Sequence, residues 1–309
     1  MSFVSSIWTG RLSEKPWKAD AVLRLIGSIV ICMLMGGLAS AVISSLKGPQ
    51  NPHEFLFLAV ISGAFVCFVI TLLMLRREWS FEDYLRKLLT CMVCVYAGFA
   101  LMWWAGNLQV EKSEVRSATV RILIGVGAFQ GMAILLVHFF LREQKLTWAE
   151  AFGFHNETLH SLLLGACAVI VVLPVVRGLQ AISILVLERL TFQPHEQETV
   201  HLLRTADTWP NRIVLGVATI VVAPLAEEIL FRGILYPWIK RVKGPELALW
   251  TTSILFGVIH LDLPTLLPLI FLAVVLACLY EYTGNLLACI ATHSVFNAAN
   301  FIALYYYPQ

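Results

Sequence analysis

Charge is scarce in this chain, and that scarcity is the first guide to its class. Charged residues make up 14% of the 309 residues and hydrophobic residues 59%, whereas a soluble domain carries about 25% charged residues. A soluble core has no room for so much apolar surface, but lipid does. The net charge of +2 is too small to indicate nucleic acid as a partner. The composition therefore predicts an integral membrane protein whose main partner is membrane lipid.

Several common signatures are also missing. All seven cysteines lie inside apolar runs, where they act as small hydrophobic residues rather than as disulfide partners. The sequence has no HExxH motif of common zinc proteases and no GxSxG elbow of serine hydrolases. Its first twenty residues are mixed and polar, which predicts neither a cleavable signal peptide nor a plastid transit peptide. We therefore expect a multi-pass protein of the bacterial cytoplasmic (inner) membrane.

Long apolar runs are what the chain does contain. A helix needs about 20 mostly apolar residues to cross the hydrocarbon core. Nine runs approach this length, and the sequence therefore predicts an all-α, polytopic transmembrane bundle of about eight to nine spans. The runs cover residues 21–46, 55–75, 88–106, 119–141, 161–188, 213–239, 247–261, 264–283 and 285–307.

Two of these runs are irregular. The seventh is short and ends at Asp262 and Pro264. The fifth contains Pro174 and Arg177, which predict a kink or a break in that helix.

Lysine and arginine in the short loops predict the orientation in the membrane. With the N-terminus inside, the inner side receives the basic clusters of residues 11–18, 76–87, 142–145 and 240–243. This excess predicts an inner N-terminus and, for nine spans, an outer C-terminus.

The sixth run carries three ionisable residues near its middle, where each costs several kcal/mol unless it faces protein or water. Glu228 and Arg232 are four residues apart and share a helix face, so we expect them to pair. Glu227 lies about 100° around the helix from Glu228 and is left free for a ligand or a water. The alternative is that all three form one structural ion network.

Histidines and an asparagine occur in two later runs. In the seventh, Phe256 and His260 are four residues apart on one face. In the ninth, His293, Asn297 and Asn300 form a polar stripe. A lone histidine on an apolar helix is usually a core residue, and a polar stripe can join helices by hydrogen bonds. Neither feature by itself indicates function.

Depth in the membrane connects these features. At about 1.5 Å per residue, Glu227 and His260 both lie roughly 20 Å from the inner face. His293 reaches about 12 Å and Asn297 about 18 Å on the same scale. Three helices thus bring polar residues to a similar level, which predicts one active site inside the membrane.

The chemistry of this set leaves two hydrolytic schemes open. A carboxylate and an imidazole can deprotonate a water for attack on a carbonyl, while a second imidazole and an amide stabilise the oxyanion. Alternatively, Glu227, His260 and His293 can hold a zinc ion with an open position for water. A third reading is a non-catalytic scaffold or transporter, although transporters often contain inverted repeats and no internal repeat is visible.

The three motifs resemble the CPBP family of intramembrane endopeptidases, also called the Abi or type II CAAX-protease family. The family pattern EExxxR, FxxxH and HxxxN is matched in order, and the resemblance covers roughly residues 195–305. The matching residues are Glu227, Glu228 and Arg232, then Phe256 and His260, then His293 and Asn297. We therefore divide the chain into N-terminal transmembrane helices without an assigned motif (1–190) and a protease core (191–309).

The resemblance implies a glutamate-type endopeptidase that cuts a peptide or protein substrate entering from the bilayer. In the family's scheme Glu227 and His260 activate water, and His293 and Asn297 stabilise the oxyanion. Supporting roles fall to the remaining motif residues, which are Glu228, Arg232 and Phe256. We expect no cofactor in this scheme, with zinc as the alternative, and no nucleic-acid partner.

Overall fold

The computed structural model describes residues 11–30, 130–154, 157–190 and 209–306. The predicted spans 55–75 and 88–106 lie outside these residues, as do most of 21–46 and about half of 119–141. The chain divides into two compact units, Leu23–Val137 and the remainder, which joins Met1–Val22 to His138–Gln309. All predicted site residues lie in the second of these, and that unit is described below.

All secondary structure in the described residues is helical, which confirms the all-α class. The helices are α6 (Met132–Glu143), α7 (Trp148–Phe152), α8 (Thr158–Arg189), α10 (Trp209–Val217), α11 (Ala223–Glu228), α12 (Tyr236–Lys243), α13 (Pro245–Val258), α14 (Leu263–Thr283) and α15 (Leu286–Tyr306). Two π-helical segments, η2 (Ala218–Val222) and η3 (Ile229–Leu235), join α10, α11 and α12 into one helix.

Four helices in the described part of the chain are long and apolar enough to cross a membrane. They are Thr158–Arg189, Arg212–Lys243, Leu263–Thr283 and Leu286–Leu304. They correspond to the fifth, sixth, eighth and ninth predicted runs. By length and composition these four helices are candidate membrane spans.

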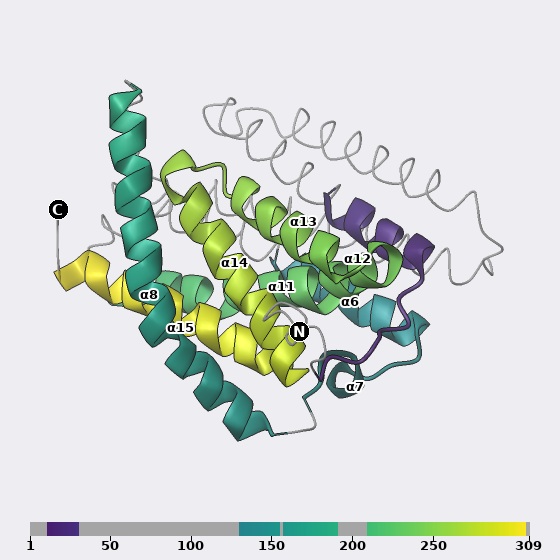
Figure 1. The fold of residues 1–309 in the computed structure, drawn as a ribbon. Helices are drawn as coiled ribbons and strands as arrows, with labels where there is room; N and C mark the ends of the chain where they lie inside the picture. The colour runs from purple at the N-terminus through teal and green to yellow at the C-terminus, as the bar shows by residue number, and fades with distance from the viewer. Residues whose placement is uncertain (1–10, 31–129, 155–156, 191–208, 307–309) are drawn as a thin grey trace, which may run out of the picture. The chain divides into compact units, whose positions relative to one another are not determined.

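The two irregular runs of the sequence have clear counterparts in the structure. Helix α13 has 14 residues, about 21 Å of helix, which is shorter than the roughly 30 Å of a hydrocarbon core. The seventh run is therefore a shorter helix and not a full span. Helix α8 continues through Pro174 without a break, but it bends near its middle (Figure 1), so of the predicted kink or break the kink is what the structure shows.

Helix α14 begins where the sequence predicts. The Asp262 side chain accepts a hydrogen bond from the Thr265 backbone at 3.2 Å, as an N-cap residue does. Pro264 occupies the first turn, where its missing N–H costs nothing. A tight turn at Asn285 then leads into α15, so that α14 and α15 lie side by side (Figure 1).

Helix α8 packs against both α14 and α15, and α13 packs between α14 and α12 (Figure 1). Helices α8 and α15 approach closely at Gly165, where a Cβ atom would lie 2.2 Å from the Ala288 carbonyl oxygen. The Thr292 hydroxyl lies between two acceptors, the Gly165 carbonyl oxygen at 2.9 Å and the Ala288 carbonyl oxygen of its own helix at 2.8 Å. A glycine thus brings two backbones into contact, as small residues do in membrane bundles, and fixes the helix that carries His293.

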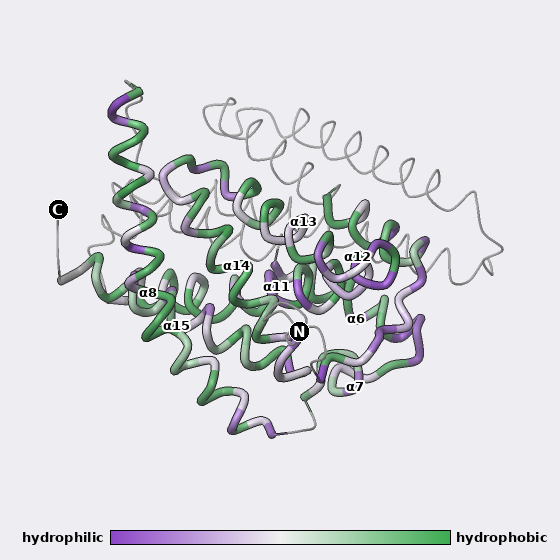
Figure 2. The backbone as a smooth tube through the Cα atoms, viewed as in Figure 1, coloured by the Kyte–Doolittle hydropathy of each residue, from purple (hydrophilic) through white to green (hydrophobic). Residues whose placement is uncertain are grey.

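The N-terminal segment and α12 meet at one end of this unit. One guanidinium nitrogen of Arg241 donates to the carbonyl oxygens of Lys15 and Trp17, at 3.4 and 3.3 Å. Hydrophilic residues gather in α12 and in this segment (Figure 2). The basic clusters 11–18 and 240–243 therefore lie at the same end, in agreement with the orientation predicted from the loops.

Candidate active site

The two glutamates lie on a helix with an unusual backbone. Glu227 and Glu228 end α11, with η2 before them and η3 after them. In η2 and η3 the backbone hydrogen bonds reach five residues back: Ala223 donates to Ala218, and Tyr236 to Phe231. Such π-helical segments occur frequently at functional sites. In each case a proline stands two residues after the end of the segment, Pro224 after η2 and Pro237 after η3.

Glu228 and Arg232 form the predicted ion pair. One guanidinium nitrogen donates to Oε1 of Glu228 at 2.8 Å, and the side chains are 0% and 1% exposed for Glu228 and Arg232. The other guanidinium nitrogen donates to the Ala273 carbonyl oxygen at 3.3 Å. The guanidinium carbon lies 4.5 Å from the Phe256 ring centroid, which is a cation–π contact. The buried cation is therefore neutralised, hydrogen-bonded and covered.

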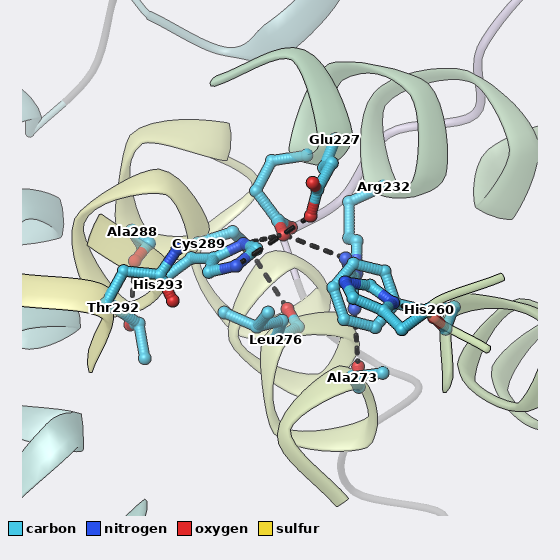
Figure 3. Close-up of polar contacts among 12 residues, drawn as sticks. Glu227, Arg232, His260, Ala273, Leu276, Ala288, Cys289, Thr292 and His293 are labelled. Carbon is cyan, nitrogen blue, oxygen red and sulfur yellow. Dashed lines mark hydrogen bonds and ion pairs between the residues drawn. The ribbon is translucent and has the colours of Figure 1, made fainter. Parts of the chain in front are cut away.

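His293 connects the two glutamates, as Figure 3 shows. Its Nδ1 atom lies 2.8 Å from Oε1 of Glu228, and its Nε2 atom lies 3.8 Å from Oε2 of Glu227. The sequence placed His293 at the level of the glutamates but did not indicate its contact with Glu228. No pattern within one helix predicts a contact between helices 65 residues apart.

His260 approaches the same region from the end of α13. Its Nδ1 atom lies 2.7 Å from the Phe256 carbonyl oxygen. A carbonyl oxygen only accepts, so Nδ1 carries the proton and Nε2 is left as the basic nitrogen of the neutral ring. The Phe256 ring is fully buried and contacts both imidazoles, with centroids 4.9 Å from His260 and 5.7 Å from His293. Phe256 thus packs between the two histidines.

Asn297 contacts the backbone of the glutamate helix. Its Nδ2 atom donates to the Thr219 carbonyl oxygen at 2.9 Å. Ala223 donates to Ala218, five residues back, so in the same register the next residue, Pro224, would donate to Thr219. Proline has no N–H and cannot make this bond. Asn297 therefore supplies the hydrogen bond that proline cannot make, and its amide retains a second N–H.

Metal binding has a simple geometric test. Within the residues that the structure describes, no three His, Cys, Asp or Glu side chains are grouped closely enough to hold a metal ion. Glu227, His260 and His293, which are the predicted zinc ligands, therefore form no ligand cluster in this conformation.

A match to a known family covers this part of the chain. Residues 209–299 match the family model described as type II CAAX prenyl endopeptidase Rce1-like. The matched segment includes all three motifs and every predicted site residue, and it confirms the resemblance to the CPBP family of membrane proteases over these residues. No curated protein and no solved structure is significantly similar to the chain.

Proposed function

We propose that this chain is an intramembrane endopeptidase in which Glu227 and His260 activate a water molecule. The observation that carries the proposal is that the two glutamates differ in burial and in hydrogen-bond partners. Glu228 is completely buried and holds both Arg232 and His293, whereas the Glu227 side chain is 17% exposed. The 3.8 Å between Glu227 and His293 is longer than a hydrogen bond. Glu227 therefore keeps a carboxylate available for water.

In this scheme a water lies between the Glu227 carboxylate and Nε2 of His260. Glu227 takes a proton from the water while the water oxygen attacks the peptide carbonyl carbon. The protonated Glu227 then gives that proton to the amine that leaves when the peptide bond breaks. Burial between helices strengthens each of these interactions, because the surroundings have a low dielectric constant.

His293 is proposed to stabilise the oxyanion as an imidazolium. Its Nδ1 atom faces the Glu228 carboxylate, so Nε2 can donate only when the ring is protonated. Glu228 faces this ring as the aspartate of a serine-protease triad faces its histidine. The four groups Glu227, His293, Glu228 and Arg232 then alternate in charge and sum to zero. The second N–H of Asn297 is the other proposed donor.

The proposed substrate is a peptide that reaches the site from the bilayer. The family description names CAAX prenyl endopeptidases, so a peptide with a prenylated C-terminal CAAX sequence is the first substrate to test. The scheme requires no cofactor. We propose the cytoplasmic membrane of a bacterium as the location, on the basis of the basic clusters in the loops.

The test compares wild type with Glu227→Gln in lipid nanodiscs. The probe is an internally quenched, farnesylated CAAX peptide, and a membrane proteome comparison of cells carrying each variant covers other substrates. Glu246→Gln is the matched control because Glu246 is an exposed acid in the first turn of α13. We expect cleavage by wild type and by the control, none by Glu227→Gln, and no effect of a zinc chelator. Cleavage by Glu227→Gln would contradict the proposal, and loss of activity with chelator that zinc restores would favour the metal scheme.

A further inference from the structure

Residues 11–17, which we name the N-terminal strap, lie outside the family match and yet contact the helices that carry the site. The Leu12 N–H donates to the Glu281 carbonyl oxygen of α14 at 3.3 Å. Arg241 of α12 donates to the carbonyl oxygen of Trp17 at 3.3 Å. Trp17 is 1% exposed and is among the largest fully buried side chains in the described residues. The strap is therefore packed into the same unit as α12 and α14.

Trp17 contacts the glutamate helix next to a site residue. Its indole Nε1 atom donates to the Gly233 carbonyl oxygen at 3.1 Å, and both residues are buried. Gly233 follows Arg232 directly in η3. A side chain does not fit at Gly233, because a Cβ atom there would lie 2.5 Å from the Phe152 ring. The glycine therefore has no side-chain contacts that could position its backbone. Its backbone position is set instead by contacts such as the one with Trp17.

Proline removes a backbone donor beside the Gly233 carbonyl oxygen. Tyr236 donates five residues back to Phe231, so Pro237 would serve Arg232 in that register of η3 and Gly233 in the four-residue register of α12. Proline has no N–H, so it makes neither hydrogen bond. A buried carbonyl oxygen is nearly always paired, and the Trp17 indole supplies the partner. A side chain also replaces a missing backbone donor at Thr219, where Asn297 serves the oxygen that Pro224 would serve in the five-residue register of η2.

We infer that Trp17 is a positioning residue of the candidate active site. Its N–H fixes the η3 backbone at Gly233, and this sets the place of the neighbouring Arg232 guanidinium against Glu228. Glu228 in turn holds Nδ1 of His293 at 2.8 Å. The N-terminal strap is thus part of the catalytic unit. The effect on turnover rests on the proposed function, but the coupling between Trp17 and Pro237 can be measured without any substrate.

The experiment is a double-mutant cycle of Trp17→Phe and Pro237→Ala in nanodiscs. Trp17→Phe removes the N–H and keeps a ring against Phe140, whose centroid lies 5.1 Å away. Pro237→Ala restores a backbone N–H four residues after Gly233. We expect Trp17→Phe alone to speed amide exchange of residues 229–236 and to lower kcat for the farnesylated CAAX peptide about fivefold, with little change in KM. In the Pro237→Ala background Trp17→Phe should change neither quantity. Trp148→Phe is the control. It also removes an indole N–H, but that N–H donates to Nδ1 of His138 at an exposed position.

Equal effects of Trp17→Phe in both backgrounds would overturn the inference, because they would indicate packing alone. Unchanged exchange in Trp17→Phe would overturn it as well. If the wild type cleaves no peptide, the proposed function fails while the exchange cycle still decides the role of Trp17. If Trp17→Phe does not accumulate as folded protein, recovery in the double variant supports the coupling and lack of recovery contradicts it.

Discussion

Nδ1 of His293 lies 2.8 Å from Oε1 of Glu228, the same oxygen that accepts the hydrogen bond from Arg232. One carboxylate oxygen thus holds a cation on its own helix and a histidine on another. Oε2 of Glu228 is buried and has no hydrogen-bond partner among the described residues. The arrangement of both neighbours therefore depends on a single oxygen atom.

Replacing Glu228 by Gln should destabilise the fold and disorganise the site. Arg232 would become a buried cation without its counter-ion, which typically costs about 3–5 kcal/mol. Thermal unfolding in detergent micelles measures this loss. The control is Glu157→Gln, because Glu157 pairs with Arg11 at an exposed position and such pairs contribute at most about 1 kcal/mol. Equal unfolding temperatures for both variants would contradict this account of Glu228.

Asn297→Ala should reduce stability because the Thr219 carbonyl oxygen loses its donor. The expected cost is about 1–3 kcal/mol. Combining it with Pro224→Ala restores a backbone N–H in the register that serves Thr219, so the loss should shrink in that background. Thermal unfolding of the four proteins gives the coupling energy.

The same four proteins separate two roles of Asn297. A fall in kcat that persists when Pro224→Ala has restored stability would identify Asn297 as an oxyanion donor. Purely additive stability effects would instead show that the hydrogen bond to Thr219 does not compensate for the proline.

Gly165→Ala should push α8 and α15 apart, because the new Cβ atom would lie 2.2 Å from the Ala288 carbonyl oxygen. Thr292 would also lose its hydrogen bond to Gly165, and His293 is the next residue. We expect a fall in thermal stability and in kcat. Gly178→Ala is the matched control on the same helix, since nothing lies within 4 Å of its added Cβ atom. Alanine there should be neutral or stabilising by about 0.5–1 kcal/mol. The packing account is contradicted if the two substitutions behave alike.

Local patterns in the sequence predicted part of this structure well. The Glu228 and Arg232 pair follows from their four-residue spacing, and the similar depth of Glu227 and His293 follows from helix rise and the position of the basic clusters. The start of α14 follows from Asp262 and Pro264. Each of these depends on residues close in sequence or on one distance along a helix.

Contacts between distant segments could not be predicted in the same way. Pro224 and Pro237 are visible in the sequence, and each removes a known backbone donor. The sequence does not indicate which side chain replaces that donor, because Asn297 and Trp17 reach the helix only through tertiary packing. The two π-helical segments were not predicted either, and each contains the carbonyl oxygen that one of these side chains contacts.

The central claim is that Glu227 acts on water while Glu228 positions other groups, and kcat of Glu227→Gln tests it most directly. Wild type and variant are compared at equal amounts of folded protein, with the farnesylated CAAX peptide or a substrate found in the proteome comparison. The account predicts an unfolding temperature close to that of wild type and a fall in kcat of about 10²–10⁴-fold, the usual contribution of a general base. A kcat within a few-fold of wild type would contradict it.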